Sequence, residues 1–190
     1  MRVITAPEEY KIQDDEVTVF LAGGICGCEN WQYDVIQKLK EIDDKERREG
    51  REGLDKLVLF NPRRENFPIG DRLESWNQIK WEFNALERCN IFSMYFCSGD
   101  SDQPICMYEL GRNIVRMQQR YATDWYGRII VSVEDGYKRK DDVVTQLSLA
   151  VGRKYEELGL VVKSSEDKKF LRENHVREIV EKYKRIVGEK

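Results

Sequence analysis

Residues 91–116, IFSMYFCSGDSDQPICMYELGRNIVR, contain an apolar run, a polar loop and a periodic apolar segment in that order. The apolar run, residues 91–97, has the length and composition of a buried strand. Pro104 suits the first turn of a helix because it lacks an N–H group, and Ser101 or Asp102 is the expected cap. The periodic segment repeats its apolar residues at helical spacing: Met107, Leu110, Ile114 and Met117. The stretch therefore predicts a strand, a short loop and an α-helix.

Glu109 lies within about two turns of the expected helix start and off the apolar stripe. The positive end of the helix dipole favours the charged form of a carboxylate placed there. The loops beyond the carboxyl ends of strands are also where open α/β sheets bind ligands. Glu109 is therefore a candidate nucleophile. The alternative is a solvated or capping side chain, because Glu is common near helix starts.

The remaining sequence repeats this alternation of strand and helix. Further apolar runs predict strands at residues 17–21, 57–60 and 128–133, with a short fifth candidate at 160–162. Apolar residues at helical spacing predict helices over residues 31–42, 73–88, 142–158 and 176–186. Near-continuous apolar strands are typical of parallel sheets covered on both sides. We therefore expect an α/β fold, a flavodoxin-like or Rossmann-like parallel sheet of four to five strands with helices on both faces. Residues 1–15 are expected to run over the surface.

Length and composition narrow the class of protein. A chain of 190 residues fits a single domain, residues 1–190. With 32 basic and 35 acidic side chains, it lacks the excess of positive charge expected for a nucleic-acid or membrane-surface partner. No apolar run spans a bilayer, and the first residues lack the order of a signal peptide. Five cysteines, an odd number, are read as reduced thiols, so a soluble, cytoplasmic protein is expected.

The sequence offers little for metal or nucleotide cofactors. Cys26 and Cys28 are separated by one residue rather than the two of common zinc sites, and the only histidine, His175, is far along the chain. The glycines of AGGICG, residues 22–27, do not match the dinucleotide pattern, and no phosphate-loop motif occurs. A serine or cysteine hydrolase needs a histidine base, and the single histidine of this chain is a poor candidate for that role. No metal and no cofactor are therefore predicted.

In the helix expected over residues 73–88, one large aromatic residue lies off the apolar stripe. Its apolar stripe consists of Trp76, Ile79, Phe83 and Leu86. Trp81 falls on the opposite side of the helix at 100° per residue. A second layer of the same chain or another subunit must cover it, and we favour the subunit because interface cores are enriched in Trp. The protein is therefore expected to be a homo-oligomer.

Carboxylate chemistry fits the remaining residues. Glu82 and Glu109 lie on predicted helices that flank the same strand, so the two acids can converge on one pocket. One acid can attack a carbon that carries a leaving group while the other handles the proton of the leaving group, as in retaining glycosyl transfer.

Four motifs in this order resemble the nucleoside 2-deoxyribosyltransferase family, over roughly residues 3–120: FLAGGI at 20–25, LFNPRR at 59–64, QIKWE at 78–82 and YELGR at 108–112. The resemblance implies that Glu109 attacks C1′ of a 2′-deoxynucleoside, expels the nucleobase and holds the sugar as a covalent ester. A second base or water then takes the sugar. The resemblance also implies that Glu82 contacts the nucleobase and that Gly23 and Gly24 lie against the sugar. Residues 98–103 would contact the hydroxyl end of the sugar.

Departures from the family pattern leave the substrate open. Better-known members have a Tyr that bonds the nucleophile where this chain has Phe20. Six residues before the nucleophile, transferases have Asp for the 5′-hydroxyl and the related hydrolases Ser for a 5′-phosphate. Here that position is Gln103, beside Asp102. The remaining candidate substrate contacts are Asn61, Arg63 and Trp81.

Two alternatives to the transferase therefore remain. Arg63, Arg64 and the glycine turn favour a 5′-monophosphate N-glycosidase, because these groups can contact a phosphate. The absence of the Tyr at Phe20 favours a non-catalytic nucleotide-binding protein. The expected small-molecule partners are a deoxynucleoside or deoxynucleotide and a free nucleobase.

Overall fold

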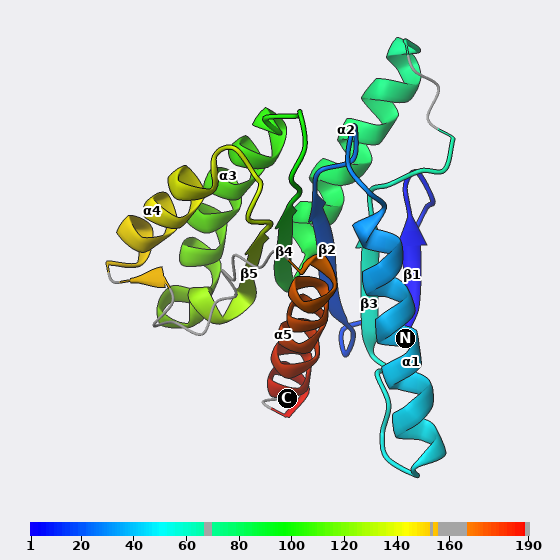
Figure 1. The fold of residues 1–190 in the computed structure, drawn as a ribbon. Coiled ribbons are helices and arrows are strands. Elements are labelled where there is room, and N and C mark those ends of the chain that lie inside the picture. Colours follow the sequence, from blue (N-terminus) through cyan, green and yellow to red (C-terminus); the bar gives the residue numbers. More distant parts are fainter. Residues whose placement is uncertain (67–69, 153, 156–166, 189–190) are drawn as a thin grey trace.

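A computed structural model describes residues 1–66, 70–152, 154–155 and 167–188. Within these residues the strands form one parallel sheet in the order β1-β3-β2-β4-β5 (Figure 1). The strands are β1 (Arg2–Thr5), β2 (Val17–Gly23), β3 (Leu57–Asn61), β4 (Ile91–Phe96) and β5 (Ile129–Val133). The predicted α/β class with a Rossmann-like parallel sheet is confirmed.

The edge strand β1 is the main departure from the predicted strands. Residues 2–5 were expected to run over the surface, but they pair in parallel with β3, from Arg2 opposite Val58 to Thr5 opposite Asn61. Only Ile4 of this strand is fully buried, so its sequence lacks the continuous apolar run that marks the central strands. The strand expected at 160–162 lies outside the described residues.

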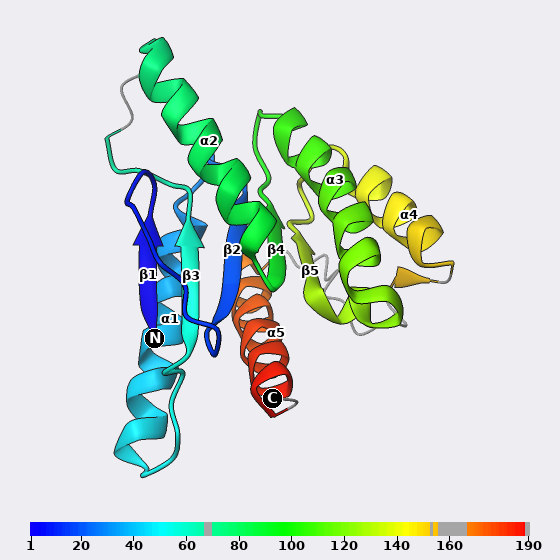
Figure 2. The same ribbon diagram turned by 180° about the vertical axis from the view of Figure 1, so that it is seen from behind.

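Helices cover both faces of the sheet. On one face α1 (Trp31–Arg48) packs beside α5 (Lys168–Gly188) over a core that includes Leu21, Leu59 and Tyr95. The opposite face carries α2 (Arg72–Arg88), α3 (Pro104–Tyr121) and α4 (Lys140–Val151), and the 3-10 segment η1 (Ala122–Arg128) follows α3 (Figure 2). This arrangement places α2 and α3 on the same side of β2 and β4.

His175 anchors α5 to the sheet as a packing residue. Its ring is completely buried, with Nε2 2.6 Å from the hydroxyl of Ser93 and Nδ1 2.7 Å from that of Ser132. Burial lowers the pKa of His175 to about 3, so the ring stays neutral at physiological pH.

Helix α2 turns its Trp81 side toward the sheet, and not the apolar stripe predicted from the sequence. Trp81 is only 7% exposed and lies in the core between Phe20, Phe60 and Tyr10. Its indole N–H donates to the backbone carbonyl of Glu8 at 2.8 Å. The prediction that another subunit covers Trp81 was therefore wrong, because the N-terminal segment of the same chain does so. Most of the predicted stripe is exposed: Trp76, Ile79 and Phe83, with only Leu86 buried.

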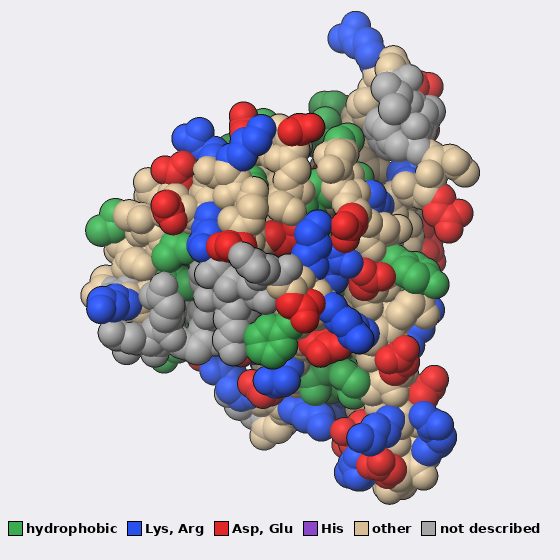
Figure 3. Space-filling view, in the orientation of Figure 1, with side chains coloured by type: hydrophobic (Ala, Val, Ile, Leu, Met, Phe, Trp, Pro, Cys, Tyr) green, Lys and Arg blue, Asp and Glu red, His purple; other side chains and the backbone are tan. Residues whose placement is uncertain are grey.

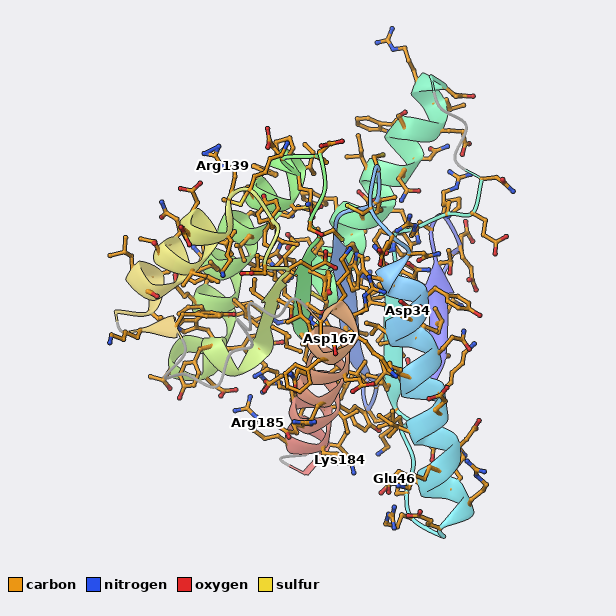
Figure 4. All side chains as sticks on the ribbon, viewed as in Figure 1. Asp34, Glu46, Arg139, Asp167, Lys184 and Arg185 are labelled. Carbon is orange, nitrogen blue, oxygen red and sulfur yellow. The ribbon has the colours of Figure 1, made fainter. Side chains whose placement is uncertain are left out.

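The face over α1 and α5 carries positive and negative side chains side by side (Figure 3). Ion pairs join the two helices along their length. Lys184 on α5 lies 3.4 Å from Glu46 on α1, and Arg172 pairs with Asp34 near the other end of α1 (Figure 4). In the described part of the chain, no helix is both long and apolar enough to cross a membrane.

Candidate active site

A cavity of about 220 Å³ opens beyond the carboxyl ends of β2 and β4, between α2 and α3. Both acids predicted from the sequence, Glu82 on α2 and Glu109 on α3, line it. Its volume is below the roughly 300–1,000 Å³ of drug-sized pockets. Helices from either side of the site thus bring two carboxylates to one small cavity.

Glu109 is partly buried and lacks a partner for its carboxylate. Among the described residues, no hydrogen bond or ion pair reaches its side chain, although its backbone carbonyl accepts a bond from Asn113 at 2.8 Å. Burial, and then the charge of Glu82, raise the pKa of Glu109 to about 8. The sequence led us to expect that the helix dipole favours the charged form. Desolvation and like-charge repulsion outweigh that dipole here.

Glu82 differs from Glu109 because a neighbour on its own helix holds it. The side-chain amide of Gln78 donates to Glu82 at 2.7 Å and also to the carbonyl of Pro62 at 2.7 Å. Burial raises the pKa of Glu82, and the bond from Gln78 partly offsets this rise. Two partly buried acids with raised pKa values in one cavity retain a proton between them near neutral pH.

The glycine turn after β2 lies against the same cavity. A Cβ on Gly23 would sit 2.2 Å from the carbonyl oxygen of Tyr95, and its φ of +148° is a conformation that other residues rarely adopt. A Cβ on Gly24 would sit 2.4 Å from the sulfur of Cys28 and 2.6 Å from the amide oxygen of Gln103. Gly23 therefore requires glycine, because a Cβ there would meet the backbone, whereas a Cβ on Gly24 would meet the ends of two side chains. Both residues line the cavity.

The start of α3 is not capped as the sequence suggested. Neither Ser101 nor Asp102 caps it: Gln103 is the residue before the helix, and its side chain makes no capping bond. Ser101 accepts the N–H of Gln103 at 3.2 Å, whereas the exposed Asp102 offers its backbone carbonyl to Tyr137 at 2.9 Å. Gln103 lines the cavity and Asp102 does not.

Three other candidate residues lie outside the cavity lining. The guanidinium of Arg63 donates to the carbonyls of Glu29 and Cys28 at 2.8 and 2.9 Å, so it braces the loop before α1. The side chain of Asn61 accepts the N–H of Arg63 at 3.1 Å. Trp81 packs behind the site, against Phe20.

Several residues of the site escaped sequence reasoning. Gln78 precedes Glu82 by four residues on α2, and that spacing alone predicts that the two side chains meet. Cys106 precedes Glu109 by three residues on α3, which likewise places both on one side of the helix. The other unpredicted lining residues come from loops and helix starts, where no periodicity marks them: Ile25, Cys26, Pro62, Pro104 and Ile105.

The described residues include no group of three or more His, Cys, Asp or Glu side chains placed to hold a metal ion. A larger cavity of about 670 Å³ lies between residues 7–10 and the side of α2 that carries Trp81. It contains neither Glu82 nor Glu109. The smaller cavity is therefore the candidate active site.

Comparison with known proteins points to the same region. A family model described as nucleoside 2-deoxyribosyltransferase like matches residues 16–123, more than half of the 190 residues. The match includes both acids, the glycine turn and every other residue that lines the cavity. No curated protein matches the chain.

Proposed function

Because the chain belongs to the nucleoside 2-deoxyribosyltransferase-like family, we propose that it cleaves the N-glycosidic bond of a 2′-deoxynucleoside and passes the sugar to a second base or to water. The observation that carries this proposal is the pair of carboxylates in one cavity: Glu109 has no partner among the described residues, and Glu82 is held by Gln78. Attack and proton transfer require two such acids with different surroundings.

The pair can perform both halves of the reaction. A carboxylate oxygen of Glu109 attacks C1′ and forms a C–O bond, while the C1′–N bond breaks and its electron pair goes to the base nitrogen. The protonated carboxyl of Glu82 supplies the proton that the departing base needs. An incoming base then attacks C1′, returns its N–H proton to Glu82 and releases Glu109. Attack by water in the same position gives hydrolysis.

The cavity favours a nucleoside over its 5′-monophosphate. The described residues of its lining include two acids and no Lys or Arg. The guanidinium of Arg63 is occupied by backbone carbonyls, and Arg64 pairs with Glu74 at 2.8 Å. A phosphate brought beside Glu82 and Glu109 would add like charge to a buried site without a cation to offset it.

A non-catalytic binding protein is the competing function, and one observation favours it. Phe20 lines the cavity and provides no hydroxyl group to orient Glu109. The two functions make different predictions for a simple assay. The protein is incubated with a 2′-deoxynucleoside, with its 5′-monophosphate and with each plus a second base, and free bases and nucleosides are separated by chromatography.

Base exchange with the nucleoside supports the transferase, and base release without exchange supports hydrolysis. Release from the monophosphate alone would overturn the preference for a nucleoside. Binding without any product supports the non-catalytic protein.

We also propose that a second copy of the chain covers α2. The helix turns Trp76, Ile79 and Phe83 outward, with exposed fractions of 64%, 62% and 51%. Ile105, at the rim of the cavity, is 66% exposed. A group of large apolar side chains exposed on one helix is typical of an interface core.

Analytical ultracentrifugation tests this proposal. The double variant Trp76→Ser/Ile79→Ser should sediment as a smaller species than the wild type. Leu149→Ser, which changes a residue with 72% exposure on α4, serves as the matched control and should not change the sedimentation. A wild type that is monomeric at micromolar concentration would overturn the proposal.

A further inference from the structure

Gln103 joins the end of β4 to the start of α3. It is 5% exposed, and its backbone carbonyl accepts the N–H of Met107 at 3.2 Å where α3 begins. Its side chain turns back to Cys97: Nε2 donates to the carbonyl of Cys97 at 2.7 Å, and Oε1 accepts the N–H of Cys97 at 3.3 Å. Both functional groups of the amide are therefore bonded to the backbone at the end of β4.

The backbone of Gln103 has an unfavourable conformation. With φ of 47° and ψ of 53°, it lies in the left-handed region, which residues other than Gly, Asn and Asp seldom adopt. Such a conformation persists only where the surrounding structure holds it. Three hydrogen bonds stabilise it here: two join the side chain to Cys97, and the third runs from the N–H of Gln103 to the hydroxyl of Ser101.

The same amide also contacts the glycine turn. Its oxygen lies 2.6 Å from the point that a Cβ on Gly24 would occupy, so the turn and the amide pack directly against each other. One side chain thus connects β4, the glycine turn and α3. Glu109 lies on α3 only six residues beyond Gln103, so the position of its carboxylate depends on how the start of α3 is held.

We propose that Gln103 is a positioning residue, whose amide fixes the start of α3 against β4 and the glycine turn so that Glu109 stays directed into the cavity. This inference rests on the proposed function. It differs from the expectation drawn from the family resemblance, which gives this position a contact with the 5′ end of the sugar. The bonds to Cys97 give the amide oxygen and the amide nitrogen of Gln103 one partner each without any such contact.

A comparison of two substrates separates these roles. Gln103→Asn keeps the amide and tolerates the left-handed backbone, but it is one methylene too short to make both bonds to Cys97. We expect it to lower kcat by about 10- to 100-fold, since small misplacements of a reacting group have effects of this order. The loss should be equal for a 2′-deoxynucleoside and for the 2′,5′-dideoxynucleoside. A loss confined to the substrate that carries the 5′-hydroxyl would overturn the proposal and show direct contact.

A second measurement does not depend on turnover. The pKa of Glu109 is followed by carbon NMR of its carboxyl group in the wild type, in Gln103→Asn and in Gly111→Ala. Gly111 lies on α3 with nothing within 4 Å of an added Cβ, so Gly111→Ala is the control and should not move the titration. Gln103→Asn should move the titration midpoint by about 0.5 pH unit or more, because Glu109 changes its surroundings.

An unmoved midpoint in a folded Gln103→Asn variant would overturn the positioning role. If the wild type shows no turnover, the proposed function is wrong. The titration of Glu109 would still test whether Gln103 positions it.

Discussion

Two glutamates at the same edge of the sheet have opposite surroundings. Glu134, just after β5, is 2% exposed and accepts the N–H and hydroxyl of Ser98 at 2.7 and 2.6 Å and the hydroxyl of Tyr95 at 3.1 Å. Arg172 lies 3.7 Å from the same carboxylate. Glu109 is partly buried, and among the described residues its carboxylate has neither a hydrogen bond nor an ion pair.

This difference shows that burial alone does not identify a reactive acid. The partners of Glu134 offset the cost of burying its charge, so its carboxylate joins β5, α5 and the loop after β4 as a structural group. Glu109 lacks such partners, and its pKa rises to about 8. Its oxygens remain available to a substrate. The comparison predicts that changes at Glu109 affect chemistry and that changes at Glu134 affect stability.

The largest expected effect is the loss of turnover in Glu109→Ala. We expect kcat to fall by about 10⁴-fold or more, because removal of a nucleophile eliminates the covalent route. Mass spectrometry of acid-quenched wild type should show the added mass of a deoxyribosyl group, and the variant should not show it. A fully active Glu109→Ala variant would falsify the assignment of the nucleophile.

Glu134→Ala should destabilise the protein by about 1–3 kcal/mol in urea unfolding, because several buried donors lose their acceptor. Asp135→Ala is the matched control. Its carboxylate forms an exposed pair with Lys140, so its loss should cost less than about 1 kcal/mol. Equal effects of the two substitutions would contradict the structural role given to Glu134.

The pH dependence of kcat/KM tests whether the two acids of the cavity share a proton. If Glu82 must be protonated while Glu109 attacks, the rate falls above about pH 8, where the pair loses its last proton. In Glu82→Gln the rate should be lower, and this fall should disappear. The acid limb should also move to lower pH, because Glu109 loses a like charge that raises its pKa. A wild-type rate that climbs steadily through pH 8 would rule out Glu82 as the proton donor.

The smallest expected effect is on thermal stability. The pKa of Glu109 is raised on folding, so the native state holds more protons than the unfolded state between about pH 4.5 and 8. The stability that protonated Glu109 contributes at low pH is therefore lost as the pH rises from about 4.5 to about 8. Glu109→Gln removes this loss, and its Tm should exceed that of the wild type by a few degrees at pH 9, with little difference near pH 4. A pH-independent difference in Tm would count against the raised pKa.

Helices α2 and α3 show how far the sequence could predict the fold. The stripe of α3 is buried at Leu110, Ile114 and Met117, as the helical spacing predicts. The spacing on α2 is equally helical, yet Trp81 faces inward because the backbone carbonyl of Glu8 accepts its indole N–H. Spacing predicts that a helix forms, but it does not predict which side faces inward when both sides carry large aromatic residues.

The sequence by itself determined the alternation of strands and helices, the parallel sheet and the placement of Glu82 and Glu109 at one site. These depend on apolar spacing and on the short-range order of motifs along the chain. Only the tertiary structure decided that the pKa of Glu109 is raised, that Arg63 braces a loop and that Gln103 bonds to Cys97. Each of these depends on electrostatic fields or hydrogen bonds between separate elements, and such contacts leave no periodic pattern in a sequence.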